Sequence, residues 1–166
     1  MHPRMAGLLL CTLPAGALAG DLIGRTVPPY PDGLHDVGGS CLTDTPGYEH
    51  ICDYSIGVLA DGAEEGAALR WIVLGRMAGR EGQQARWLIT DAVAHPDTGA
   101  GYHLQTGTCR LDGKEDDRVL AVVRDDPQGE LLTDVVWARR VQLPQARFLP
   151  IEPARVDCLN EAALGL

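Results

Sequence analysis

Serine, lysine and basic charge are all scarce in this chain. Ser40 and Ser55 are its only serines, and Lys114 is its only lysine. Neither serine lies in the Gly-x-Ser-x-Gly sequence of a serine hydrolase, which disfavours that class of enzyme. With 14 basic residues against 23 acidic ones, the chain also lacks the basic excess that binding to nucleic acid or anionic lipid requires. We therefore expect no nucleic-acid partner.

Long apolar runs are absent as well. No segment has the roughly 20 predominantly apolar residues of a membrane span. The apolar run at 5–13 follows a basic start and precedes the small-residue segment 17–19. This order is typical of a secretory signal peptide, which we assign to residues 1–20, with cleavage near Ala19/Gly20. The sequence thus predicts a periplasmic or secreted protein with no membrane insertion.

The cysteines show no Cys-x-x-Cys spacing. Beyond residue 20 they are Cys41, Cys52, Cys109 and Cys158. In an oxidising compartment an even number most simply forms two disulfides, for which three connectivities exist. We expect Cys41 to pair with Cys52, its near neighbour in sequence, and Cys109 to pair with Cys158. The spacing disfavours a zinc site, and oxidation disfavours a nucleophilic cysteine, so we expect no metal and no cofactor.

Glycine and proline divide the remaining chain into two parts. Residues 21–50 are rich in both, and we predict an irregular N-terminal arm there. Residues 51–166 alternate short apolar runs with turn sequences, which predicts a domain made of antiparallel β-hairpins. The fold class we expect is mainly β, in a single disulfide-stapled domain, with α+β as the alternative.

The individual strands follow from the period-2 alternation and from β-branched residues. We expect them at 54–60, 67–76, 85–93, 102–109, 118–124, 135–141 and 147–151. The segment 118–124, which lies between acidic pairs, is continuously apolar from 119 to 123, and this indicates a strand buried on both faces. Residues 130–134 are predicted as a helical turn, and residues 156–158 as the strand that closes the sheet.

Several short segments resemble those of small exported proteins of Gram-negative bacteria. The resemblance rests on the segments at 30–34, 39–41, 109–113, 116–117 and 137–139. It implies a periplasmic, cystine-bearing domain, and it implies no activity or catalytic residue.

One pair of histidines is a candidate for chemistry. His95 and His103 flank a glycine-rich loop and could converge with Asp91 or Asp97 on a general base or a metal site. Histidines beside proline and glycine are also common as solvated loop residues. The acidic segment 112–117 lacks the glycine and the closing glutamate of a calcium-binding EF-hand loop. We assign no catalytic residue and no metal ligand on this basis.

Aromatic and arginine side chains are the candidates for protein binding. Trp71, Trp87 and Trp137 would anchor an interface if exposed, although tryptophan on a strand is more often part of the core. Arg139 and Arg140 could form part of a carboxylate-recognition face. Their clustering also follows simply from the predominance of arginine among the basic residues.

These features favour a periplasmic protein-binding module, such as an inhibitor or immunity protein of an envelope-active enzyme. The first alternative is a small periplasmic hydrolase or metal-binding enzyme that uses the region of His95 and His103. A second alternative is a structural accessory protein of the cell envelope. The sequence thus favours a binding protein over an enzyme.

Overall fold

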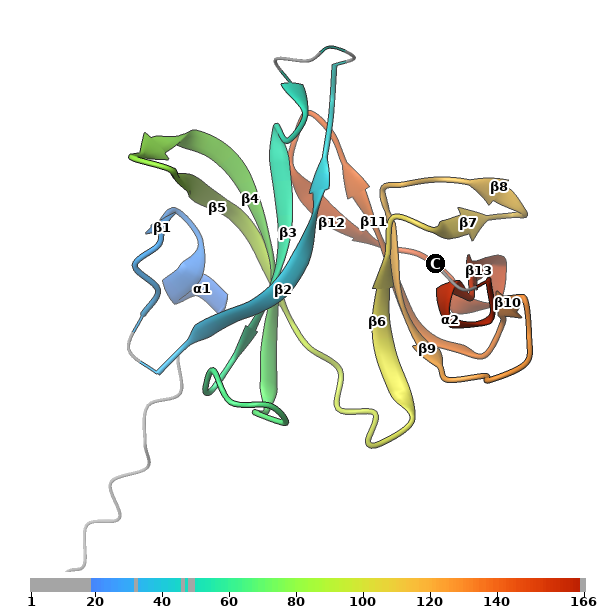
Figure 1. The fold of residues 1–166 in the computed structure, drawn as a ribbon. Helices are drawn as coiled ribbons and strands as arrows, with labels where there is room; N and C mark the ends of the chain where they lie inside the picture. Colours follow the sequence, from blue (N-terminus) through green and yellow to red (C-terminus); the bar gives the residue numbers. More distant parts are fainter. Residues whose placement is uncertain (1–18, 32, 46, 48–49, 165–166) are drawn as a thin grey trace, which may run out of the picture.

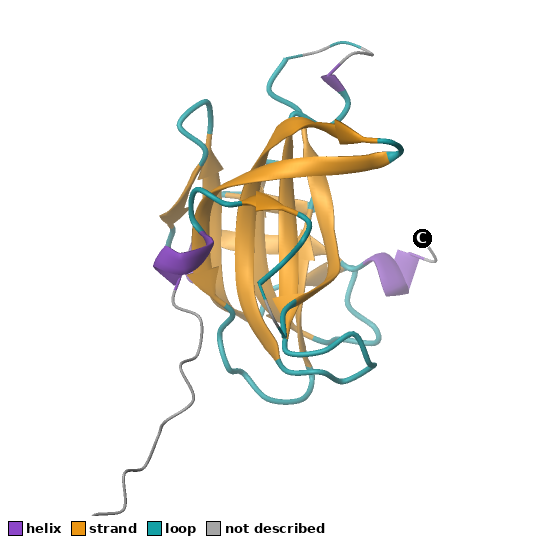
Figure 2. Cartoon of the chain, turned by 90° about the vertical axis from the view of Figure 1, so that its left-hand side faces the viewer, coloured by secondary structure: helices purple, strands orange, loops and turns teal. Residues whose placement is uncertain are grey.

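The computed structural model describes residues 19–31, 33–45, 47 and 50–164, and it is mainly β, as predicted (Figure 1). The strands are β1 (Thr26–Val27), β2 (His35–Leu42), β3 (Tyr54–Ala60), β4 (Leu69–Glu81), β5 (Gln84–Ala94), β6 (Tyr102–Thr106), β7 (Cys109–Leu111), β8 (Lys114–Glu115), β9 (Val119–Arg124), β10 (Leu131–Leu132), β11 (Val135–Gln142), β12 (Arg147–Pro150) and β13 (Val156–Leu159). The helical segments are α1 (Ala19–Leu22), the 3-10 turn η2 (Pro153–Arg155) and α2 (Glu161–Leu164). α1 and α2 lie at the margins of the molecule (Figure 2).

Within the described residues the strands form three antiparallel sheets. The first sheet has the order β1-β5-β4-β3-β2, the second β12-β11-β9-β6, and the third β10-β13-β7-β8. Hairpins join β3 to β4, β4 to β5 and β11 to β12, as the alternating pattern predicted. The long β4 and β5 carry register shifts that allow the first sheet to bend.

The hydrophobic core lies in layers between these sheets. The first and second sheets enclose one cluster, which includes Ile56, Leu74 and Phe148. The second and third sheets enclose another around the Cys109–Cys158 disulfide. β9 contributes Leu120 to the first cluster and its alternate residues, such as Val119, to the second. The continuous apolar sequence of β9 follows from this burial on both faces.

Both predicted disulfide pairings are confirmed. Cys41 is bonded to Cys52, and this bond closes the connection between β2 and β3. Cys109 is bonded to Cys158, and these two residues also face each other in the register of β7 and β13. The second bond therefore joins neighbouring strands inside a buried cluster.

The expectation of an irregular arm at 21–50 is wrong for β1 and β2. β2 pairs with β3 along its whole length, so the predicted boundary between residues 50 and 51 falls inside a hairpin. The sequence concealed this strand because glycine has a low β-propensity. Gly39 is nevertheless required, since a Cβ there would lie 2.0 Å from the backbone oxygen of Ile56. Tertiary pairing outweighs local propensity in this strand.

Two further expectations need correction. The predicted helical turn at 130–134 contains β10, where Leu131 pairs with Leu159 and Leu132 with Cys158. Residues 156–158 belong to β13, which forms part of the separate third sheet and does not close a single sheet. A two-residue strand has no periodicity of its own, and its pairing partner is distant in sequence, so no local pattern reveals it.

Residues 1–18 of the predicted signal peptide lie outside the described residues. Ala19 and Gly20, the last two residues assigned to it, belong to α1, in which Leu22 is fully buried against the first sheet. The predicted cleavage near Ala19 would leave this buried leucine in the remaining chain. In the part of the chain that the structure describes, no helix is both long and apolar enough to cross a membrane.

Candidate functional site

The connection between β2 and β3 projects beyond the sheets, at the top of Figure 1. Its described residues are 43–45, 47 and 50–53, and the Cys41–Cys52 disulfide ties its two ends together. We call this segment the cystine loop. Asp44 of the loop is paired with Arg118, just before β9, at 3.5 Å. A projecting loop that is held at its base is a favourable shape for insertion into a partner.

An exposed apolar side chain belongs to this loop. Ile51 is 70% exposed, more than any other large hydrophobic side chain in the described residues. The hydroxyl of Thr43 donates a hydrogen bond of 3.0 Å to the backbone oxygen of Ile51. The isoleucine is therefore presented to solvent on a backbone that is fixed to the opposite side of the loop.

Asp53 ties the same loop together through its carboxylate. The carboxylate accepts a hydrogen bond from Nδ1–H of His50 at 2.9 Å and one from the backbone N–H of Asp44 at 3.2 Å. The hydrogen bond from His50 is the main cause that lowers the pKa of Asp53, with the backbone N–H groups adding to it. The carboxylate therefore stays ionised at neutral pH and links both arms of the loop.

β2 continues from the cystine loop along the edge of the first sheet. No strand among the described residues pairs with its outer edge, and its first five residues are exposed. Val37, at the register shift of this strand, is 44% exposed. A shallow hollow of about 340 Å³ runs along Gly38 to Cys41, and the buried hydroxyl of Ser40 has no hydrogen-bond partner in the described structure. Such an edge can accept an extended segment of another chain.

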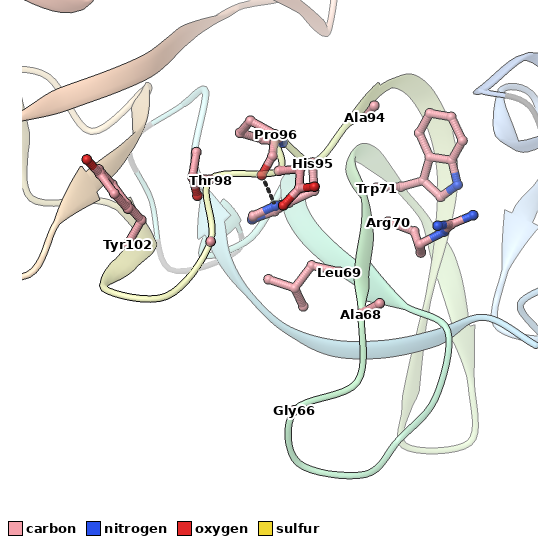
Figure 3. A pocket seen from close by; sticks show the side chains of 12 residues that line it. Gly66, Ala68, Leu69, Arg70, Trp71, Ala94, His95, Pro96, Thr98 and Tyr102 are labelled. Atoms are coloured by element: carbon pink, nitrogen blue, oxygen red, sulfur yellow. Dashed lines mark hydrogen bonds between the residues drawn. The ribbon is translucent and has the colours of Figure 1, made fainter.

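A second candidate site is a cavity of about 710 Å³ between the start of β4 and the linker from β5 to β6 (Figure 3). Leu69 lies on the side of Thr98 and Tyr102, whereas Arg70 and Trp71 lie on the opposite side. Arg70 is paired with Asp61 at 3.2 Å. The polar and aromatic groups of this cavity thus do not converge on a single point.

His95 lines this cavity, and its ring is fixed by a backbone contact. Nδ1–H donates to the backbone oxygen of Pro96 at 2.9 Å, which leaves Nε2 with its lone pair. Burial lowers the pKa of His95, while the hydrogen bond to Pro96 opposes this in part. The imidazole is therefore neutral at neutral pH. Nε2 itself is buried and has no hydrogen-bond partner in the described structure.

The structure gives His103 a separate set of partners. Its Nδ1 lies 2.6 Å from a carboxylate oxygen of Asp125, and its Nε2 lies 3.0 Å from the side-chain oxygen of Gln105. Gln105 in turn donates to the hydroxyl of Thr108 at 2.6 Å. His103 does not line the cavity of His95.

The two aspartates that sequence analysis associated with these histidines also lie in different settings. Asp91 accepts hydrogen bonds from the backbone N–H groups of Phe148 and Ala92, so it links β5 to β12. Asp97 lines the cavity of His95. Among the described residues, no group of three or more His, Cys, Asp or Glu side chains could hold a metal ion.

The tryptophans predicted as binding anchors are partly buried. Trp71 lines the cavity of His95, Trp87 packs over Gly75, and Trp137 packs against the core between the first and second sheets. The guanidinium of Arg139 lies over the ring of Trp137, 4.8 Å from its centre. These aromatic rings therefore stabilise the fold, and each of them also contributes its exposed part to the surface.

Two of the arginines near the second and third sheets are paired with carboxylates of the chain itself. Arg140 donates to Asp116 at 2.6 Å, and Arg155 is paired with Asp112, whose pKa is lowered by this contact. Arg140 therefore already has a carboxylate partner inside the molecule.

Sequence analysis missed the cystine loop and Ile51. A signal for them was present, since the short segment between Cys41 and Cys52 must form a closed loop if these cysteines pair. The exposure of Ile51 follows only from the direction in which this loop leaves the sheet.

The chain was compared with protein-family models, with curated proteins and with solved structures. None of them matches it. The candidate functional features of the molecule are therefore the cystine loop, the β2 edge and the cavity of His95.

Proposed function

We propose that this protein is a periplasmic or secreted protein-binding module that inserts its cystine loop into a cleft of an envelope-active enzyme, as an inhibitor or immunity protein does. One observation carries the proposal: Ile51 is 70% exposed on a projecting loop closed by the Cys41–Cys52 disulfide. An exposed apolar side chain on a braced loop is well suited to anchor an interface.

The energetics favour such an anchor. Full burial of an isoleucine side chain contributes about 1.5–3 kcal/mol. The cystine and the hydrogen bonds of Thr43 and Asp53 restrict the loop before it binds. Less conformational entropy is then lost on association, so more of the burial energy appears as affinity.

The edge of β2 adds a second contact surface beside the loop. Its free backbone groups can pair with an extended segment of the partner, while the loop occupies the cleft. The net charge of −9 favours a partner with a basic surface around that cleft. The free edge supports protein binding beside the loop, and the net charge supports a basic partner.

The test begins with capture of a stoichiometric partner from periplasmic and secreted fractions. The affinity of that partner is then measured for the wild-type protein and for Ile51→Asp. We expect affinity to fall by about 100-fold, because the substitution removes apolar burial and places a charge in the cleft, together about 3 kcal/mol.

Ile23→Asp is the matched control. Ile23 is 45% exposed and directly follows α1 in the chain. α1 lies away from the connection between β2 and β3 (Figure 1). This identical substitution should leave the affinity unchanged. Equal losses in the two variants, or no loss in Ile51→Asp, would contradict binding through the loop.

A second candidate function is catalysis or small-ligand binding at the cavity of His95. Its volume of about 710 Å³ lies within the range of small-molecule sites, and the neutral imidazole of His95 is in the protonation state of a general base. If this function holds, His95→Gln should abolish any measured activity, whereas His103→Gln should retain it, because His103 does not line the cavity. The opposite result would remove this candidate.

A further inference from the structure

The two cystines of this protein differ sharply in their accessibility. Cys109 and Cys158 are 1% and 0% exposed inside the cluster between the second and third sheets. Cys41 is exposed and Cys52 is half-buried, at the base of the projecting loop. Thiol–disulfide exchange requires a thiolate to approach a sulfur atom directly, so only the first cystine is open to it in the folded protein.

The position of the accessible bond gives its reduction a local consequence. Cys41 lies on β2 opposite Ser55 of β3, and Cys52 lies where the chain returns from the loop. The bond therefore closes the loop that carries Ile51. Once it is broken, the described cross-links between the arms of the loop are the hydrogen bond from Thr43 to Ile51 and those from the backbone N–H groups of Asp44 and Thr45 to Asp53. Asp44 also keeps its ion pair with Arg118 at 3.5 Å.

The other strand pairings and the second cystine do not include Cys41 or Cys52. The first sheet retains the pairing of β3 with β4 and of β4 with β5, and the buried cystine still joins β7 to β13. Breaking the Cys41–Cys52 bond should thus loosen the cystine loop and leave the layered core in place.

We propose that the Cys41–Cys52 bond is a site of thiol–disulfide exchange with dithiol reductants, through which the cystine loop is released while the Cys109–Cys158 bond is retained. A thiolate of the reductant attacks the Sγ of Cys41, the more exposed residue of the pair, forming a mixed disulfide and releasing Cys52 as a thiolate, which takes up a proton. The second thiol of the reductant then attacks the mixed disulfide. This step frees Cys41 as a thiol and oxidises the dithiol to a disulfide, so two electrons pass to the protein.

The consequence for binding rests on the proposed function of the loop. In an oxidising compartment the loop is closed and able to bind its partner. A dithiol, such as the active-site pair of a thiol oxidoreductase, reduces the bond and opens the loop. Because the chemical step involves no binding partner, it can be tested independently of that function.

The experiment treats the native oxidised protein with dithiothreitol for increasing times, blocks free thiols with iodoacetamide, and measures each cysteine by peptide mapping. We expect Cys41 and Cys52 to become alkylated at least about tenfold faster than Cys109 and Cys158, because burial shields the second pair. In denaturant, where both bonds are accessible, the two rates should converge. Equal rates in the native protein, or faster reduction of Cys109–Cys158, would overturn the proposal.

Hydrogen exchange on the selectively reduced and alkylated protein tests the release of the loop. Amides of residues 43–53 that were protected should exchange faster, while those of β9 should keep their protection. Unchanged exchange in the loop would refute its release. If reduction is selective and the loop opens, yet the oxidised protein captures no partner, the exchange site stands and the proposed binding function fails.

Discussion

Removing the two cystines one at a time should cost different amounts of stability. The paired substitutions are Cys41→Ala with Cys52→Ala, and Cys109→Ala with Cys158→Ala. Each double variant removes one bond without leaving an unpaired thiol. The two bonds close chain segments of very different length, with sequence separations of 11 and 49 residues.

The expected magnitudes follow from the entropy that each bond removes from the unfolded chain. For separations of 11 and 49 residues, the chain-entropy relation gives about 2.8 and about 4.1 kcal/mol. The second pair is also fully buried, so loss of its sulfur atoms leaves voids in the cluster that cost about 1 kcal/mol each. We therefore expect a loss of about 3 kcal/mol for the first double variant and of about 5–6 kcal/mol for the second.

Equilibrium denaturation in guanidinium chloride, followed by far-UV circular dichroism and tryptophan fluorescence, measures both losses. The first variant should remain folded, with the midpoint moved to lower denaturant. The second should be marginal or unfolded, since domains of this size have about 5–15 kcal/mol of stability in total. Equal losses, or a larger loss for the Cys41/Cys52 variant, would refute the argument from loop length and burial.

Two further predictions concern single positions. Gly39→Ala should destabilise the protein by at least about 2 kcal/mol, because the new Cβ would lie 2.0 Å from the backbone oxygen of Ile56. Thermal or chemical denaturation measures this loss. A stability within about 0.5 kcal/mol of wild type would contradict the close contact. His95→Gln should weaken the pH dependence of the unfolding free energy between about pH 5 and pH 7. Burial lowers the pKa of His95, so the unfolded chain binds the proton more readily than the folded protein does. The wild-type protein therefore loses stability as pH falls through about 6.5. Identical slopes of unfolding free energy against pH in the two proteins would show that His95 is not the group responsible.

Local patterns in the sequence correctly indicated the elements that carry their own periodicity. β3 occupies Tyr54–Ala60, the span that the alternation predicted, and β9 lies within the predicted buried run. β2 and β10 were missed, since their strand conformation depends on pairing with β3 and β13 and not on their own residues. Glycine at positions 38 and 39 concealed the first, and the short length of β10 concealed the second.

The candidate site, too, could be predicted from the sequence only in part. Sequence analysis identified His95 and His103 as a pair because they lie close along the chain. The structure gives them different partners, since the linker from β5 to β6 carries the chain from the first sheet to the second. The separation of two side chains on either side of such a linker is set by how the sheets pack, and no spacing rule predicts it.

The sequence by itself indicated the mainly β fold and the pairing of the cysteines. The first follows from alternation between apolar and polar residues, which is local, and the second was the simplest choice for cysteines spaced in this way. Tertiary structure alone decided the division into three sheets, the burial of one cystine and the exposure of the other, and the projection of Ile51. These properties depend on contacts between residues far apart in sequence, where packing and burial outweigh local preference.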